Sequence, residues 1–332
     1  MKSVANRHPL SILDWYEKKF EIADGPIAAA GSCFAQHIGR HLKTSGFSYV
    51  DTEPSPHWMP AEAAPKFGYG IYSARFGNIY SPRQLLQLMD RALGVRQDDE
   101  IWRFRGGYVD PLRPTIEPPL ETPEQVDVSR RLHLKNVALM FRLAKTFIFT
   151  LGLTETWINK DTGTAYPLCP GTNGGEFNPH KHELVNFDHQ QIVSDLDAFI
   201  SKFRANRPDG QIILTVSPVA LMATATGGNV VVSSSYSKAV LRAAAGHLAG
   251  KHEFVDYFPS YEIIASPPMR SMFFEPDMRE VNPYGISHVM EQFFSQHRPS
   301  KAHGFALAKN EPKVCRADAI CDEILLEIME TQ

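Results

Sequence analysis

The sequence predicts an α/β fold in which helices cover both faces of a mostly parallel sheet. Three strand-like segments are apolar almost throughout, over residues 27–30, 147–152 and 212–219, and helical patterns separate them. Near-continuous apolar strands are typical of parallel sheets, because both faces of such a sheet are buried. Active sites in these sheets lie beyond the C-terminal ends of the strands. The site is therefore expected at residues 31–32, 152–157 and 217–218, and in the loop over residues 274–282.

Local patterns predict each remaining element. Phe34, Ile38 and Leu42 recur at four-residue spacing, which forms one apolar stripe on a helix. Ser81 followed by Pro82 is a typical helix start, with an N-cap and then a proline in the first turn. Helices are expected over residues 33–44, 82–92, 130–145, 190–204, 234–248 and 283–294, and two weaker strands over residues 47–51 and 253–261.

Two segments between these elements are expected to be insertions in a single domain. Residues 95–128 are rich in proline, and residues 158–189 are rich in glycine and histidine. Both could build walls or a lid for a site. Arg113 either pairs with a carboxylate that pins the first insertion or contacts an anionic group of a substrate. The domain is expected to end near residue 300, before a tail (residues 301–332) that holds a helix over residues 317–330.

The composition argues against several classes of protein. The chain has 332 residues, 43% of them hydrophobic and 11% aromatic, so it can bury a large core. Lys and Arg total 34 against 37 Asp and Glu, a net charge of −3, and no basic block favours nucleic acid as a partner. No run of about 18 apolar residues predicts a membrane span, and the N-terminus lacks the apolar core of a signal peptide. Four cysteines without a CxxC pair favour a reducing, cytoplasmic setting.

The sharpest local feature is the sequence Gly-Ser-Cys-Phe-Ala at residues 31–35, directly after the first predicted strand. Ser32 should lie at a helix N-terminus, where free N–H groups and the helix dipole favour a developing oxyanion. Ser32 is either a nucleophile there or only an N-cap, a role for which serine is well suited. Cys33 is a rival nucleophile or a small buried residue.

Residues 31–35 also spell the motif that names the GSCFA family, a branch of the SGNH/GDSL hydrolase superfamily, and the chain resembles this family over most of its length. Four more segments resemble family motifs in the family's order: TLG with a later Trp over residues 150–157, TVSPV over 215–219, SKAVLR over 237–242 and YFPSYEI over 257–263. The resemblance implies a three-layer α/β/α sandwich with a five-stranded parallel sheet. It also implies a shallow site in which Ser32 is the nucleophile.

The same resemblance assigns an oxyanion hole. Gly77, with Asn78 beside it, looks like the second-block glycine that supplies an N–H to the oxyanion. Gly152 begins the third block, in which Thr154 stands where the superfamily usually has an asparagine. A threonine hydroxyl can donate one hydrogen bond, with a shorter reach than asparagine.

The resemblance leaves the identity of the general base open. The last superfamily block reads Asp-x-x-His-Pro; Asp277 aligns with its aspartate, but Glu280 stands at the position of the histidine. An ordinary glutamate is a weak base toward a serine hydroxyl unless burial raises its pKa. His288, early in the last predicted helix, and His182, in the second insertion, are the alternatives. We favour His288, because imidazole is the better-matched base near neutral pH.

No metal and no cofactor are expected. His180, His182 and His189 lie in or next to the second insertion with Cys169, but their spacing matches no standard metal site. The sequence therefore predicts a serine esterase, acyl hydrolase or acyltransferase that acts on a small-molecule ester, for example an O-acylated saccharide. The alternative is a catalytically inactive binding module that keeps the fold and the pocket but has lost the catalytic histidine.

Overall fold

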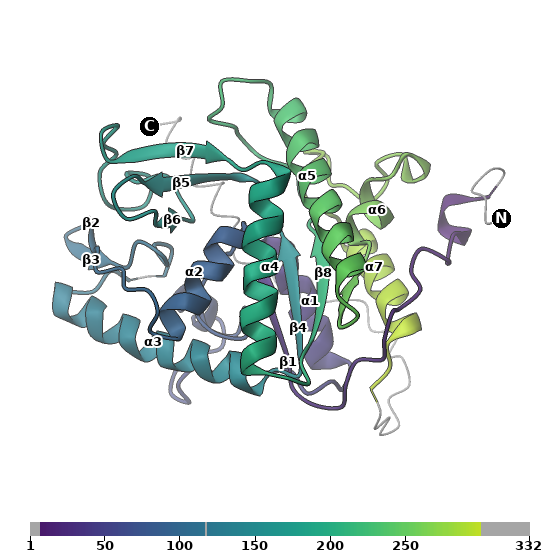
Figure 1. Cartoon of the computed structure of the whole chain (residues 1–332), viewed down its shortest axis with the longest axis horizontal. Coiled ribbons are helices and arrows are strands. Elements are labelled where there is room, and N and C mark those ends of the chain that lie inside the picture. Colours follow the sequence, from purple (N-terminus) through teal and green to yellow (C-terminus); the bar gives the residue numbers. More distant parts are fainter. Residues whose placement is uncertain (1–6, 117, 300–332) are drawn as a thin grey trace.

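The computed structural model describes residues 7–116 and 118–299 (Figure 1). Its centre is a parallel sheet of four strands in the spatial order β1, β4, β8, β9. These strands are β1 (Ile27–Gly31), β4 (Thr146–Leu151), β8 (Gln211–Val216) and β9 (Val255–Tyr257). The predicted α/β class with a parallel sheet is confirmed.

The sheet has four strands in the described part of the chain, not the five that the resemblance implied. The predicted strand over residues 47–51 forms only an isolated parallel bridge, between Tyr49 and Ile27. The N–H of Ala29, two residues further along the same edge of β1, donates instead to the side-chain oxygen of Ser73 at 2.9 Å. A serine hydroxyl thus occupies the edge position that a fifth strand would need.

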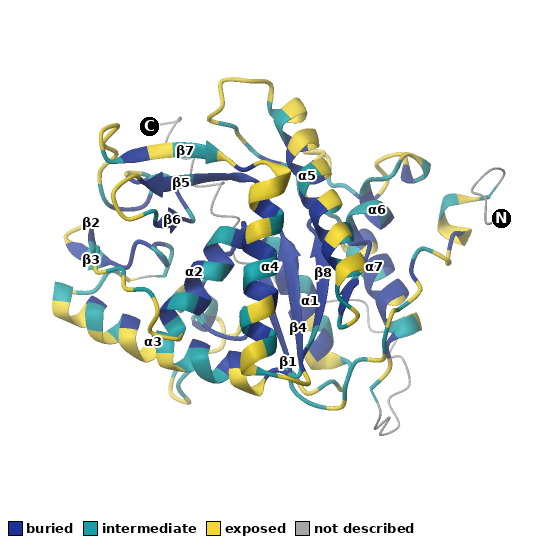
Figure 2. Cartoon of the chain, viewed as in Figure 1, coloured by how far each residue is buried: buried dark blue, intermediate teal, exposed yellow. Residues whose placement is uncertain are grey.

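Helices cover both faces of the sheet, because the side chains of each strand alternate between two cores. Phe147 and Phe149 of β4 lie in the core that α2, α3, α4 and α5 complete, whereas Ile148 lies in the core that α1, α6 and α7 complete. In Figure 1, α4 and α5 pass in front of β4 and β8, and Figure 2 shows these strands buried beneath helices with exposed outer faces. The helices are α1 (Cys33–Thr44), α2 (Pro82–Ala92), α3 (Pro123–Leu143), α4 (His189–Asn206), α5 (Val230–Lys251), α6 (Ser260–Ala265) and α7 (Pro283–Gln296).

The predicted helices are present, and the largest differences are at two helix starts. Helix α3 begins at Pro123 rather than at residue 130, since Thr122 caps it by accepting from the N–H of Gln125 at 3.3 Å. Helix α5 begins at Val230 rather than at residue 234, since Asn229 accepts from two N–H groups of its first turn. The helix predicted over residues 317–330 lies outside the described residues. Within the described ranges, no helix combines the length and apolarity that crossing a membrane requires.

The two insertions form small sheets of their own. The first holds an antiparallel pair, and the second provides most of a three-stranded antiparallel sheet. The strands of the pair are β2 (Trp102–Phe104) and β3 (Gly107–Val109), and those of the three-stranded sheet are β5 (Glu155–Asn159), β6 (Ala165–Tyr166) and β7 (His182–Asn186).

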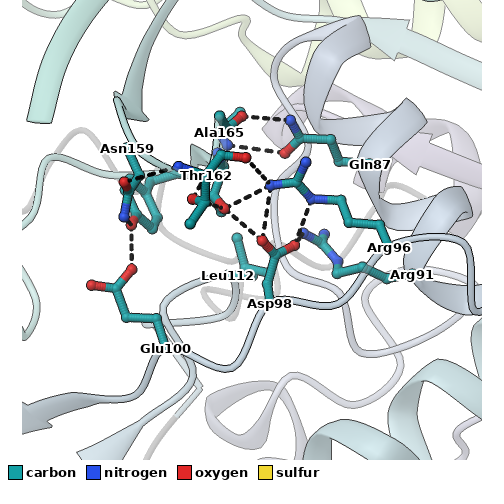
Figure 3. Close-up of polar contacts among 12 residues, drawn as sticks. Gln87, Arg91, Arg96, Asp98, Glu100, Leu112, Asn159, Thr162 and Ala165 are labelled. Atoms are coloured by element: carbon teal, nitrogen blue, oxygen red, sulfur yellow. Dashed lines mark hydrogen bonds and ion pairs between the residues drawn. The ribbon is translucent and has the colours of Figure 1, made fainter. Parts of the chain in front are cut away.

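A polar network ties both insertions to α2 (Figure 3). Asp98, in the first insertion, accepts hydrogen bonds from Arg91 of α2 at 3.1 Å and from Arg96 at 2.8 Å. Gln87, also on α2, accepts from the N–H of Ala165 in β6 at 2.9 Å. The insertions are therefore fixed beside the main sheet by buried and half-buried hydrogen bonds to one helix.

Arg113 belongs to a second polar group in the first insertion. It donates to one carboxylate oxygen of Asp110 at 3.1 Å, and Arg130 of α3 donates to the other oxygen at 3.2 Å. All three side chains are buried. Of the two roles considered for Arg113, pinning the insertion is the one that these contacts support.

A buried hydrogen-bonded group fastens the N-terminal segment to β9 and to the end of α7. The hydroxyl of Tyr16 donates to Asp256 at 2.6 Å and lies 2.9 Å from Nε2 of His297. His297 is 1% exposed, and burial lowers its pKa to about 4. The folded protein therefore holds this imidazole in its neutral form at neutral pH.

We predict that stability falls as the pH drops from about 6.5 toward 4, because the unfolded chain then takes up a proton on His297 that the folded protein excludes. This one group contributes a slope of up to about 1.4 kcal/mol per pH unit. Urea unfolding of wild type and His297→Gln across this range measures the contribution. The free energy of unfolding should depend less steeply on pH in the variant than in wild type. Burial also lowers the pKa of His133 to about 4, but His133 is present in both proteins, so its contribution cancels in the comparison. Equal slopes would show that His297 contributes nothing.

Candidate active site

Ser32 lies between the C-terminal end of β1 and the first residue of α1. Its N–H donates to the carbonyl oxygen of Thr150 in β4 at 3.2 Å, which extends the pairing one residue beyond β1. Gly31 has a φ of +147°, and a Cβ there would lie 2.4 Å from the same carbonyl oxygen. Only glycine fits at this position, so a close backbone contact fixes the turn that presents Ser32.

The hydroxyl of Ser32 does not cap the helix that it begins. Ser32 occupies the N-cap position of α1, but its side chain accepts no hydrogen bond from the first turn. The residue is 3% exposed, and its Oγ has no hydrogen-bond partner among the described residues. By contrast, the hydroxyl of Ser81 accepts from the N–H of Gln84, and the side chain of Gln84 accepts from the N–H of Ser81. These two bonds form a capping box. A buried hydroxyl without a partner is costly, and a catalytic role is one reason to keep it.

Ser32 lines a small pocket at the ends of three neighbouring strands. The turn after β1 contributes Ser32 and Cys33, the loop after β4 contributes Gly152, and the loop after β8 contributes Ser217. The loop before α7 contributes Arg279. All four places at which the sequence predicted a site therefore meet around one pocket.

One lysine and one arginine side chain reach this pocket. Lys238 of α5 is 4% exposed, and its Nζ donates to the carbonyl oxygen of Gly152 at 2.7 Å. Arg279 is 8% exposed, and its Nε donates to the carbonyl oxygen of Ala220 at 3.1 Å. Both side chains thus hold wall loops in place, and the guanidinium of Arg279 brings positive charge toward Ser32, which favours negative charge in a substrate or transition state.

The first half of α5 turns a polar face toward the sheet. Ser234, Ser237 and Lys238 are all buried there. The hydroxyl of Ser237 accepts from the N–H of Thr154 at 3.0 Å, and that of Ser234 accepts from the N–H of Leu221 at 3.2 Å. This helix therefore positions the loops after both β4 and β8.

Sequence reasoning did not assign Lys238, although a signal was present. Lys238 precedes Leu241 by three residues and Ala245 by seven, so the three share one face of the predicted helix. A lysine on a helix face that is otherwise buried is uncommon unless it has a specific task. No comparable signal exists for Arg279, because periodicity does not fix the direction of a loop side chain.

Gly152 and Thr154 do not form the oxyanion hole that the family resemblance implied. Thr154 is fully buried, and its hydroxyl donates to the side-chain oxygen of Asn186 in β7 at 2.6 Å rather than lining the pocket. Gly152 lies against Ser32, since a Cβ on Gly152 would be 3.1 Å from the Cβ of Ser32. Its own N–H donates to the carbonyl oxygen of Tyr80 at 2.8 Å. Gly152 thus gives the pocket its space, and its N–H is engaged elsewhere.

Gly77 and Asn78 begin the segment that leads to the pocket. Gly77 has a left-handed φ of +71°, and the side-chain oxygen of Asn78 accepts a hydrogen bond from the hydroxyl of Tyr72. Asn78 lines a separate cavity between α2, α3 and the first insertion. Of residues 77–80, only Tyr80 lines the pocket of Ser32.

The two carboxylates of the last block lie outside the pocket. Asp277 is exposed, and one of its oxygens accepts from the N–H of Arg279 at 2.9 Å and from that of Glu280 at 3.0 Å. Glu280 is also exposed, and Met278 adopts a left-handed φ of +59°. Asp277 therefore caps this turn, and the residue that the turn directs into the pocket is Arg279.

The two candidate histidines are buried in other places. His288 of α7 stacks on Phe273 with 5.1 Å between ring centroids, and burial lowers its pKa. His182 of β7 accepts from the N–H of Asn178 at 3.1 Å, and its ring packs against Tyr166. Neither ring lines the pocket of Ser32. Within the described ranges, no three His, Cys, Asp or Glu side chains are grouped to hold a metal ion.

Comparison with known families settles the relationship that these blocks suggested. The model of the GSCFA family matches residues 26–293. The chain belongs to the GSCFA family. A search of curated proteins gives no significant match.

Solved structures give distant similarities to this GSCFA-family chain. A carbohydrate esterase family 3 structure from Talaromyces cellulolyticus has a TM-score of 0.39 and 10% identity, covering 82% of this chain and 95% of its own. An acetyl esterase mutant with acetate ion has a TM-score of 0.36 and 10% identity, with coverages of 82% and 95%. An acetyl xylan esterase from the rumen bacterium Butyrivibrio proteoclasticus has a TM-score of 0.26 and 15% identity, with coverages of 72% and 56%.

We predict that Ser32→Ala changes the free energy of unfolding by less than about 0.5 kcal/mol, because it removes a buried hydroxyl that makes no hydrogen bond. Ser81→Ala, the matched control, should cost about 1 kcal/mol, because it removes a working capping box. Urea denaturation at pH 7 measures both. A loss of about 1 kcal/mol or more in Ser32→Ala would contradict the prediction and restore the N-cap interpretation.

Proposed function

We propose that this GSCFA-family protein is a serine esterase, a hydrolase or transferase of acyl groups, with Ser32 as its nucleophile. The observation that carries the proposal is the state of the Ser32 hydroxyl. It is buried, makes no hydrogen bond among the described residues, and lines a pocket at the end of the central sheet. A hydroxyl in this state at a helix N-terminus is well suited to attack a bound carbonyl carbon.

The charges around the pocket support acyl chemistry. Attack by Ser32 on an ester develops negative charge on the carbonyl oxygen. Arg279 lines the same pocket, and a charged donor stabilises such an oxyanion more strongly than a neutral donor. Collapse of the intermediate expels the alcohol and leaves an acyl group on Ser32. Water then completes hydrolysis, or a second alcohol completes transfer.

The dimensions of the pocket favour a short acyl group. The pocket is small and partly open to solvent, so the alcohol part of the ester lies outside it. The chain continues from the pocket residue Leu221 into a mostly exposed loop, residues 222–229, that carries hydroxyl and amide side chains. In this loop Thr224 donates to Glu155 at 2.7 Å and the side-chain oxygen of Asn229 caps α5. We propose an O-acylated saccharide as the substrate class, with its sugar outside the pocket and against this loop.

One observation favours the alternative of a binding module without turnover. Among the described residues that line the pocket there is no histidine and no carboxylate. In that case Ser32, Lys238 and Arg279 would bind an anionic group without breaking a bond. Turnover by the wild-type protein distinguishes the two functions.

Ser32→Ala should reduce hydrolysis of p-nitrophenyl acetate by at least about 100-fold, because the acyl group then has no acceptor. Cys33→Ala should keep most of the wild-type activity. Steady-state release of p-nitrophenol measures both variants beside wild type. Activity that survives in Ser32→Ala and disappears in Cys33→Ala would reassign the nucleophile. No turnover by wild type, on this ester or on O-acetylated oligosaccharides, would favour the binding module.

A further inference from the structure

We infer that Lys238 is the general base that activates Ser32, so that the site is a Ser–Lys pair without histidine. The inference rests on the proposed esterase function and adds the group that accepts the serine proton. Lys238 and Ser32 line the same pocket, whereas Asp277, Glu280 and His288 do not.

Few groups in the pocket can accept a proton. Among the described residues that line it, the ionisable side chains are Cys33, Tyr80, Lys238 and Arg279. Arginine does not give up its proton in proteins, and therefore cannot become a base. Neutral thiol and phenol groups are proton donors and only weak acceptors. The neutral amine of a lysine has a lone pair, and Ser–Lys pairs are an established way to activate serine.

Lys238 is also held at the wall of this pocket. Its Nζ donates to the carbonyl oxygen of Gly152 at 2.7 Å. Gly152 in turn lies against Ser32, since a Cβ on Gly152 would be 3.1 Å from the Cβ of Ser32. This carbonyl group thus holds the amine at the wall of the pocket that Ser32 lines; Oγ of Ser32 makes no hydrogen bond in this structure, so the two groups must approach for proton transfer. A neutral amine donates through its N–H groups and keeps the lone pair on its nitrogen.

Packing alone does not account for a lysine at this position. The later buried residues of α5 are Leu241, Ala244, Ala245 and Leu248, and the earlier ones, Ser234 and Ser237, hold the wall loops with neutral hydroxyls. Burying an ammonium costs several kcal/mol before any compensation. The helix therefore retains an ionisable amine, which is costly to bury, at the one buried position that faces the pocket of Ser32, and a role in proton transfer explains it.

Nζ of Lys238 takes up and releases a proton twice in each cycle. Nζ of Lys238 takes the hydroxyl proton as Oγ of Ser32 bonds to the acyl carbon, and the carbonyl electron pair moves onto oxygen. On collapse the bond from the acyl carbon to the alcohol oxygen breaks, and the ammonium of Lys238 returns the proton to the leaving alkoxide. Water then attacks the acyl-Ser32 ester while Nζ takes its proton. That proton returns to Oγ as the carboxylic acid leaves.

A fluorophosphonate tests this role without knowledge of the natural ester, because it phosphonylates an activated serine and releases fluoride. Mass spectrometry of the full-length protein measures the rate of labelling at Ser32 between pH 5 and 9. In wild type the rate should rise with pH as one proton is lost. Lys238→Met should slow labelling by about 100-fold or more and remove that rise. Lys238→Arg should slow it equally, because arginine keeps the charge and cannot accept a proton.

Lys251→Met is the matched control on the same helix. Lys251 lies at the end of α5, where its Nζ pairs with Asp197 at 2.7 Å. This variant should keep the wild-type rate and pH profile. Rescue separates a base from a structural lysine: added primary amines such as ethylamine should restore part of the labelling in Lys238→Ala, faster for more basic amines. Thermal unfolding confirms that each variant is folded.

Two results would overturn the assignment. One is a folded Lys238→Met or Lys238→Arg that labels at the wild-type rate with an unchanged pH profile. The other is a loss of labelling in His288→Gln while Lys238→Met keeps it. A wild-type protein that does not label at Ser32 at all would refute the nucleophile itself, and so the proposed function together with this inference.

Discussion

The whole site depends on one contact, the close pairing of the C-terminal ends of β1 and β4. Gly31 allows the two backbones to approach so closely that a Cβ would lie 2.4 Å from the carbonyl oxygen of Thr150, and Ser32 N–H bonds to that same oxygen. Gly152, two residues after Thr150, lies against Ser32, and its carbonyl oxygen accepts a hydrogen bond from Lys238. A single backbone contact thus sets the positions of the proposed nucleophile, the pocket wall and the proposed base.

Local patterns made much of this fold predictable. Apolar runs gave the central strands, and the strand, glycine and helix around Ser32 fixed its place without knowledge of distant residues. The fifth strand was not predictable in this way. The edge of β1 is closed by the side chain of Ser73, and no periodicity reports a hydroxyl that takes the N–H of Ala29.

The chemistry of the site was harder to predict because it depends on directions that only tertiary contacts fix. Asp277 caps its own turn, and that turn brings Arg279 to the pocket while Glu280 is exposed. His288 packs on Phe273. The sequence shows Lys238 as a lysine on an otherwise buried helix face. Only the tertiary structure brings α5 to the pocket of Ser32 and so suggests a role for Lys238.

Acid quenching during turnover tests the central claim, that Ser32 carries the acyl group, most directly. Full-length protein is mixed with p-nitrophenyl acetate, quenched in acid within one turnover, digested and mapped by tandem mass spectrometry. The account predicts an acetyl ester on Ser32 in wild type and its absence at this position once the reaction is complete. An acetyl group on Cys33 or on Nζ of Lys238, with Ser32 unmodified at every time, would contradict it.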